Sequence, residues 1–146
     1  MTKKNFISSL HNSTKRDYLK RMINNKVKCM RVAKKYEFDY WDGNRKYGYG
    51  GYKYIQGRWR KVAKKIIKEY KLKKGSKILD VGCGKGYLLY EMMLIQPGLK
   101  IYVIDISKHA IKDSFHLKNL FLTKAYARKK LPYKNKNFDL AISLAT

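Results

Sequence analysis

The sequence lacks the features that would place the chain in or beyond a membrane. No apolar run approaches the length of about 18 residues that a transmembrane helix requires. The first residues, MTKKNFISSL, are basic but contain no long apolar core, so they make a poor signal peptide. The 2 cysteines, Cys29 and Cys83, are too few for a disulfide framework or a four-ligand metal site. These absences predict a cytoplasmic protein without a metal.

Acidic residues are also scarce. Asp and Glu number 10 against 35 Lys and Arg, which gives a net charge of +25 at pH 7. Such a charge attracts polyanions, for example nucleic acid or anionic lipid headgroups. The basic residues are mostly lysine, however, and lysine, asparagine, isoleucine and tyrosine are all frequent, as in proteins from AT-rich genomes. Under either interpretation the charge predicts weak nucleic-acid binding at low salt.

Enough apolar residues remain to form a core. They make up 45% of the 146 residues, a length that suits one domain. Apolar residues recur at helical spacing over about 15–35, behind a capping signal at Thr14, and again over about 58–70. We expect residues 1–57 to form a basic helical and Gly/Tyr-rich extension, and residues 58–146 to form the main domain.

The most informative stretch is KILDVGCGKGYLL, from Lys77 to Leu89. A buried strand leads into a turn with glycine at every second position, and an apolar helix follows. Alternate glycines before a helix N-terminus make a cradle for a ligand. The dinucleotide fingerprint would need glycine where Tyr87 stands, and a P-loop would need glycine at Leu79 and Ser or Thr at Gly86. The turn therefore fits neither of these two nucleotide loops.

The rest of the chain alternates strand and helix patterns. Strands are predicted at 100–106, 120–125 and 137–144, with helices at about 85–95 and 107–118. This β-α-β-α-β-loop-β order predicts an α/β fold with a parallel sheet and right-handed crossovers. Asp105 closes the second strand about twenty residues after the glycines, where a carboxylate accepts hydrogen bonds from the ribose hydroxyls of a nucleoside.

Four motifs together resemble the first half of the class I S-adenosylmethionine-dependent methyltransferases: ILDVGCGKG, VIDIS, LPY and FDLAIS. The resemblance covers the chain from about Leu72 to its last residue. It implies a Rossmann-like parallel sheet with helices on both faces, S-adenosyl-L-methionine as cofactor, and methyl transfer to an unidentified acceptor. The family has a seven-stranded sheet, whereas this chain stops at the fourth predicted strand, so we expect a fragment or a truncated domain.

The resemblance also implies which residues bind the cofactor. They follow the first two strands: Asp80, Gly82, Cys83, Gly84, Gly86, Asp105 and Ile106. The glycines and Cys83 would line the methionine moiety and Asp80 would reach its amino group, directly or through water. Asp105 would hold the ribose, Ile106 would pack on adenine, and the tail 143–146 would lie beneath the sulfonium.

Two positions limit what the resemblance implies. Ala127 stands where many family members carry an Asp or Asn that accepts a hydrogen bond from the adenine amine, so adenine would rely on packing, on backbone contacts or on Tyr126. None of His11, His109 and His116 falls in a motif that would make it a base. The sequence therefore predicts no catalytic residue.

The stretch from 36 to 60 holds about half of the tyrosines, several of them interleaved with glycine. It follows neither the helical nor the strand period, which predicts loops and turns. Its rings suit a lid or substrate wall, or stacking on bases, and equally suit burial against the domain. The substrate candidates are Tyr47, Tyr49, Tyr52 and Tyr54. A basic RNA-associated binding protein and an inactive truncated methyltransferase-like protein are the alternative functions.

Overall fold

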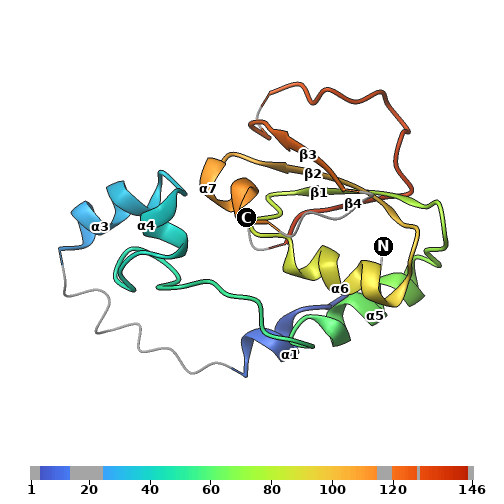
Figure 1. Ribbon diagram of the computed structural model, residues 1–146, viewed down its shortest axis with the longest axis horizontal. Coiled ribbons are helices and arrows are strands. Elements are labelled where there is room, and N and C mark those ends of the chain that lie inside the picture. Colours follow the sequence, from blue (N-terminus) through green and yellow to red (C-terminus); the bar gives the residue numbers. More distant parts are fainter. Residues whose placement is uncertain (1–3, 14–24, 115–119, 128, 145–146) are drawn as a thin grey trace.

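A parallel four-stranded sheet forms the centre of the molecule (Figure 1). The structure is a computed structural model that describes residues 4–13, 25–114, 120–127 and 129–144. The strands are β1 (Lys77–Val81), β2 (Lys100–Asp105), β3 (Leu120–Lys124) and β4 (Leu140–Ile142), in the spatial order β3-β2-β1-β4. All three neighbouring pairs are parallel. The predicted α/β class and parallel sheet are confirmed, although β4 is shorter than the predicted 137–144.

The described helices are α1 (Ser8–His11), α3 (Lys26–Ala33), α4 (Phe38–Trp41), α5 (Arg60–Glu69), α6 (Tyr87–Ile95) and α7 (Lys108–Lys112). The helices expected over 58–70 and 85–95 are confirmed by α5 and α6. For the helix expected over 15–35, the described part is α3, and the predicted cap at Thr14 lies outside the described residues. The helix expected over 107–118 is shorter in the structure, because α7 reaches its C-cap at Asp113.

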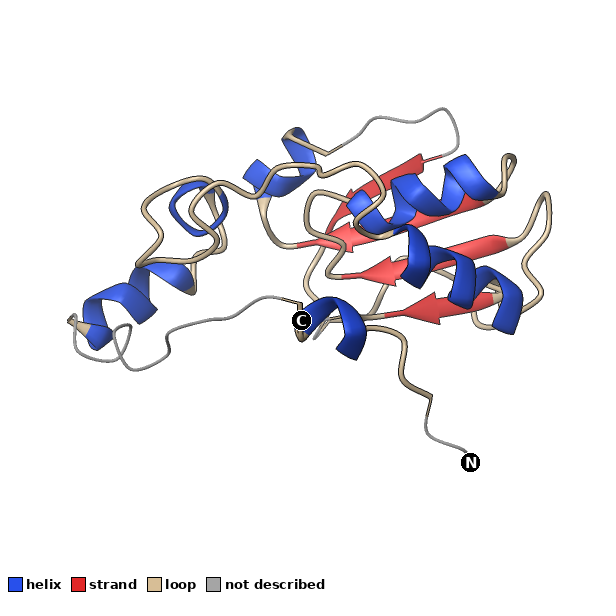
Figure 2. Cartoon of the chain, turned by 90° about the horizontal axis from the view of Figure 1, so that it is seen from below, coloured by secondary structure: helices blue, strands red, loops and turns tan. Residues whose placement is uncertain are grey.

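The main core lies between one face of the sheet and the helix pair α5 and α6 (Figures 1 and 2). The sheet contributes Ile78, Ile101, Val103 and Leu140, and the helices contribute Val62, Ala63, Ile66, Leu88, Leu89 and Met92. Successive strand residues point to opposite faces, so Ile101 and Val103 lie on the same face. The apolar stripes that the sequence shows on both helices are thus buried against it.

The opposite face of the sheet carries aromatic side chains. Tyr102 stands in register between Leu79 and Phe121, and its ring stacks on Phe121 with centroids 4.5 Å apart. Tyr133 and Phe138 pack edge-on against Tyr102 at 5.8 and 5.1 Å. Among the described residues, the predicted loop between β3 and β4 therefore supplies side chains to this face, for which the resemblance implied helices.

Residues 36–57, here called the aromatic segment, are joined to α6 through Glu91. This carboxylate is fully buried and accepts from the Tyr54 hydroxyl at 2.7 Å, from the Gly57 N–H at 2.7 Å and from Arg60 Nε at 3.1 Å. Burial alone would raise the pKa of Glu91, but these donors hold it below the ordinary value. A charge in the middle of an apolar helix thus fixes the end of the aromatic segment.

In the described part of the chain, no helix is long and apolar enough to cross a membrane.

Candidate functional site

The carboxyl ends of β1 and β2 bring the predicted cofactor residues together. Val81 pairs with Ile104 across the two strands, and the Gly82 N–H continues the ladder by donating to the Ile104 carbonyl at 2.7 Å. The three loop glycines then take φ values of 80°, 56° and 74° at positions 82, 84 and 86. Because residues that carry a side chain rarely adopt this left-handed backbone region, the loop favours glycine at each of these three positions.

The Asp105 carboxylate is fixed in place by two backbone N–H donors. It is 8% exposed, its Oδ2 accepts from the Gly84 N–H and its Oδ1 from the Ser107 N–H, both at 2.8 Å. The Ser107 hydroxyl in turn accepts from the Ala110 N–H at 2.9 Å and caps α7, as the sequence predicts. A carboxylate has about four acceptor positions, so Asp105 keeps capacity for hydroxyl donors of a ligand.

Asp80 lies beside Asp105 and is 5% exposed. Burial, and secondarily the charge of Asp105, raise the pKa of Asp80 to about 7. Near neutral pH both the protonated and the ionised form of this carboxyl group are therefore populated, and a cationic group bound next to it would favour the ionised form.

The remaining cofactor candidates occupy the loop and the end of the sheet. Burial raises the pKa of the Cys83 thiol, so it stays protonated and is a poor nucleophile. Ile106 directly follows Asp105 and is half-buried. The Ser143 hydroxyl donates to the Val81 carbonyl at 3.0 Å, which places the start of the predicted tail beside β1; residues 145–146 lie outside the described residues.

Trp41 is a part of this site that the sequence did not predict. It ends α4, is 8% exposed, and its Nε1 donates to the Ser107 hydroxyl at 3.0 Å and to the Tyr36 carbonyl at 2.9 Å. Its Cη2 lies only 2.7 Å from the position that a Cβ on Gly84 would take. The aromatic segment therefore packs directly on the glycine loop, through a ring that no period or motif distinguishes.

The structure separates the four substrate candidates into two pairs. Tyr52 and Tyr54 line a cavity of about 580 Å³, together with Asp42, Lys53, Lys85, Tyr87, Asp113 and Ser114. Tyr47 and Tyr49 line a second cavity of about 370 Å³ next to α3. The two pairs still touch, because the rings of Tyr49 and Tyr52 lie 4.5 Å apart. Of the two cavities, only the first includes residues of the glycine loop.

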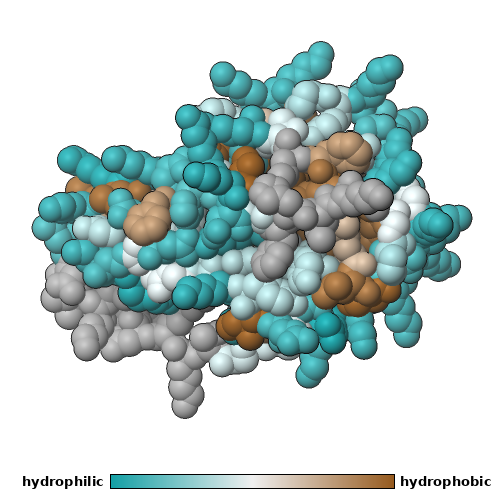
Figure 3. All heavy atoms as spheres, in the orientation of Figure 1, coloured by the Kyte–Doolittle hydropathy of each residue, from teal (hydrophilic) through white to brown (hydrophobic). Residues whose placement is uncertain are grey.

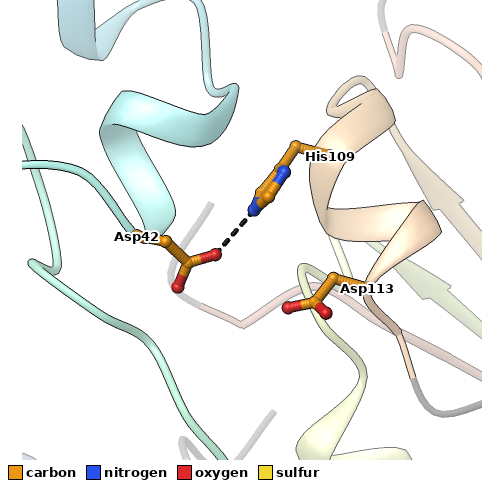
Figure 4. A group of neighbouring side chains, drawn as sticks. All are labelled: Asp42, His109 and Asp113. Carbon is orange, nitrogen blue, oxygen red and sulfur yellow. Dashed lines mark hydrogen bonds and ion pairs between the residues drawn. The ribbon is translucent and has the colours of Figure 1, made fainter.

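A network of ion pairs joins the aromatic segment to the glycine loop and α7. Lys85 is 2% exposed, and its Nζ lies 2.7 Å from Asp42 Oδ2 and 2.6 Å from Asp113 Oδ2. His109 Nε2 lies 2.6 Å from the same Asp42 oxygen, and Figure 4 shows the two carboxylates and the imidazole converging. Burial would raise the pKa of Asp42, but Lys85 and His109 lower it.

The side chains of Asp42, His109 and Asp113 are of the kinds that bind divalent cations, and their ligand atoms lie within 4.8 Å of one another. The ammonium of Lys85 already stands between the carboxylates of Asp42 and Asp113, and it offsets part of their negative charge. A cation would have to displace this buried lysine. The cluster is therefore a clamp between segments of the chain, and it gives no grounds for a metal site.

Comparison with known proteins identifies the family. A family model described as a methyltransferase domain matches residues 72–146, half of the chain. The chain belongs to this family. Membership of a methyltransferase family is the prediction made from the four sequence motifs, and it is confirmed.

Individual relatives match shorter stretches. The chain is 56% identical over 34 residues to the tRNA N(3)-methylcytidine methyltransferase trm141 of Schizosaccharomyces pombe, covering 23% of this chain and 14% of the relative. It is 34% identical over 65 residues to the mitochondrial arginine-hydroxylase NDUFAF5 of Mus musculus, covering 44% and 19%. A solved structure from Anabaena variabilis, described as a methyltransferase of an antibiotic biosynthesis pathway, matches with a TM-score of 0.51 and 27% identity over 56% of this chain and 32% of that one.

The chain thus spans about a third or less of each of these proteins. The two curated relatives are named for different reactions, so similarity to them does not identify the acceptor.

Proposed function

We propose that this protein binds S-adenosyl-L-methionine at the carboxyl ends of β1 and β2 and transfers its methyl group to an acceptor. The observation that carries the proposal is the Asp105 carboxylate, buried and fixed by two backbone donors beside a loop of left-handed glycines. Family membership supports it independently. The bound cofactor would supply a methyl group on a positively charged sulfonium, and S-adenosylhomocysteine would leave as the acceptor takes the methyl group.

Each predicted contact has a physical role in this proposal. Asp105 accepts from the ribose hydroxyls, and Asp80 accepts from the amino group of the methionine moiety. The backbone of Gly82, Cys83, Gly84 and Gly86 lines that moiety, and Ile106 packs on adenine. The protein contributes alignment of donor and acceptor, so no residue is assigned as a base.

The larger cavity is the proposed acceptor site, because it adjoins the glycine loop through Lys85 and Tyr87. The Tyr54 hydroxyl donates to Glu91 and the Tyr87 hydroxyl donates to the Tyr52 carbonyl, so these groups are already engaged. Burial raises the pKa of Tyr52 to about 12, which keeps it neutral. Ring faces of Tyr52 and Tyr54 would therefore contact the acceptor, with Tyr47 and Tyr49 one layer behind them.

Asp105→Ala tests the cofactor site. Removing the carboxylate deletes the acceptor for two ribose hydroxyls, and we expect the Kd for S-adenosylhomocysteine to rise about a hundredfold. Isothermal titration on the full-length gene product measures it. Asp139→Ala is the matched control, since Asp139 also binds a backbone N–H, that of Lys77 at 2.7 Å, but at the amino end of β1. Wild-type affinity in Asp105→Ala, or no heat and no thermal shift with the wild type, contradicts the proposal.

Nucleic-acid contact is a second candidate, favoured by α5. Four lysines stand on this helix at positions 61, 64, 65 and 68, a spacing that places them on one face, and all are exposed. Figure 3 shows that hydrophilic side chains dominate the visible surface of the described residues. One relative is named for methylating tRNA. We propose that the α5 lysines contact the backbone of an RNA, weakly and without sequence preference.

Reversing the charge of the α5 lysines distinguishes RNA contact by this helix from attraction by the overall positive charge of the chain. Replacing Lys61, Lys64 and Lys65 by Glu is expected to weaken RNA binding strongly and to reduce the slope of log K against log salt by about two. Fluorescence anisotropy with a labelled single-stranded RNA at several salt concentrations measures both. The control replaces Lys26 and Lys28 on α3 and Lys34 at its C-cap by Glu, which changes the net charge equally. Equal losses in the two triple variants would show that only the overall charge matters.

Two sequence-based predictions remain proposals. The boundary between an N-terminal extension and the main domain stays at residue 57, although the aromatic segment packs on the glycine loop. A cytoplasmic location is the other, and it rests on the sequence features given above.

A further inference from the structure

Trp41 touches both residues that hold the Asp105 carboxylate. Its indole N–H donates to the hydroxyl of Ser107, whose own N–H binds Asp105 Oδ1. Its benzo ring lies against Gly84, whose N–H binds Asp105 Oδ2. One side chain therefore contacts the supports on the two sides of the carboxylate.

The position of Trp41 is itself fixed by its neighbours in the sequence. Asp42 accepts from Lys85 of the glycine loop and lies against His109, and Glu37 accepts from the backbone N–H groups of Lys108 and His109 at 3.1 and 2.9 Å. These two carboxylates, at the N-cap and the C-cap of α4, attach α4 to the start of α7. Tyr49 stacks on the outer face of Trp41 with centroids 5.3 Å apart. The ring thus has little freedom to move away from Ser107 and Gly84.

We propose that Trp41 is a positioning residue of the cofactor site, which holds Asp105 in the orientation that accepts the ribose hydroxyls. It acts through Ser107 and Gly84 and does not itself need to touch the cofactor. This inference rests on the proposed function of Asp105. It also means that cofactor affinity depends on a residue outside the matched family domain of residues 72–146.

Trp41→Phe tests the inference because it keeps an aromatic ring and removes the indole N–H. We expect the Kd for S-adenosylhomocysteine to rise about tenfold, since the Ser107 hydroxyl loses a buried partner and the Asp105 support loosens. Ser107→Ala breaks the same hydrogen bond from the other side and should give a similar loss. It keeps the inference testable if Trp41→Phe does not fold, which circular dichroism and the melting temperature would reveal.

A double-mutant cycle distinguishes positioning from general destabilisation. If Trp41 acts through Asp105, then Trp41→Phe added to Asp105→Ala causes no further loss of affinity. Additive losses, or wild-type affinity in both Trp41→Phe and Ser107→Ala, overturn the inference. Wild-type affinity in Asp105→Ala alone instead contradicts the proposed function.

Trp59→Phe is the matched control, because the chain has 2 tryptophans and Trp59 packs against the main core at the start of α5. We expect it to keep the wild-type Kd for S-adenosylhomocysteine. This variant also leaves Trp41 as the sole tryptophan, so binding of S-adenosylhomocysteine should change its fluorescence. A tenfold loss in Trp59→Phe would mean that any indole removal weakens the site, and the inference would fall.

Discussion

Gly84→Ala is expected to abolish measurable binding of S-adenosylhomocysteine and to lower the free energy of unfolding by roughly 3 kcal/mol. Gly84 has φ +56°, a region in which an L side chain costs about 1–2 kcal/mol. The added carbon would also stand 2.7 Å from Cη2 of Trp41, a ring that is buried and hydrogen-bonded at its opposite edge. Relieving the clash moves the Gly84 N–H away from Asp105. Urea unfolding and isothermal titration measure the two effects.

Gly75→Ala provides the control for backbone strain alone. Gly75 has φ +88°, and nothing lies within 4 Å of the carbon that alanine would add. It precedes β1, at the opposite end of that strand from the glycine loop. We expect the cost of the left-handed backbone, about 1–2 kcal/mol, and unchanged affinity for S-adenosylhomocysteine. If Gly84→Ala costs no more than Gly75→Ala and still binds, the contact between Trp41 and the glycine loop has no role.

The sheet and the meeting of Asp105 with the glycine loop could be predicted because their signals are local. Alternate glycines permit left-handed backbone whatever surrounds them, and the apolar runs before Asp80 and Asp105 define two strands. Parallel pairing then brings the ends of those strands together, so Asp105 meets the Gly84 N–H across 21 residues of sequence. No knowledge of the remaining chain is needed for this step.

Trp41 could not be predicted, because its role depends on contacts distant in the sequence. It bonds to Ser107 across 66 residues, and it belongs to α4, a single turn without a period. The sequence shows Lys85 only as a basic residue of the glycine loop, yet in the structure it is buried and paired with Asp42 and Asp113. Glu91 similarly stands in an apolar helix and becomes buried because donors from the aromatic segment surround it.

The tyrosines of the aromatic segment show a related limit. The sequence leaves open whether their rings form a lid or substrate wall, stack on bases or pack against the domain. In the structure Gly50 and Gly51 take φ values of 69° and 100°, and these turns redirect the chain between Tyr49 and Tyr52. The sequence shows that glycines allow turns, but the direction of each turn depends on what the rings pack against.

Asp80→Asn is expected to raise the free energy of unfolding by about 4 kcal/mol at pH 8 and by little at pH 4. The pKa of Asp80 rises from 3.8 to about 7 on folding, because burial disfavours its charged form. Below pH 4 both states are protonated. As the pH rises toward 7 the unfolded chain releases the proton while the folded chain keeps it, so stability falls, and above pH 7 the loss is complete. Asparagine stays neutral throughout and avoids this loss.

The same carboxyl group should make cofactor affinity depend on pH. An ammonium group binds the ionised form of Asp80, so the affinity of the wild type for S-adenosylhomocysteine should rise with pH up to about 7 and level off above it. Below pH 7 the expected slope is up to about tenfold per pH unit. Asp80→Asn should bind more weakly at pH 8 and lose this dependence, although it is more stable. The exposed carboxylate variant Asp139→Asn is the control for general charge effects. A stability difference between Asp80→Asn and the wild type that stays constant from pH 5 to pH 8 would show that Asp80 titrates as an ordinary surface carboxylate.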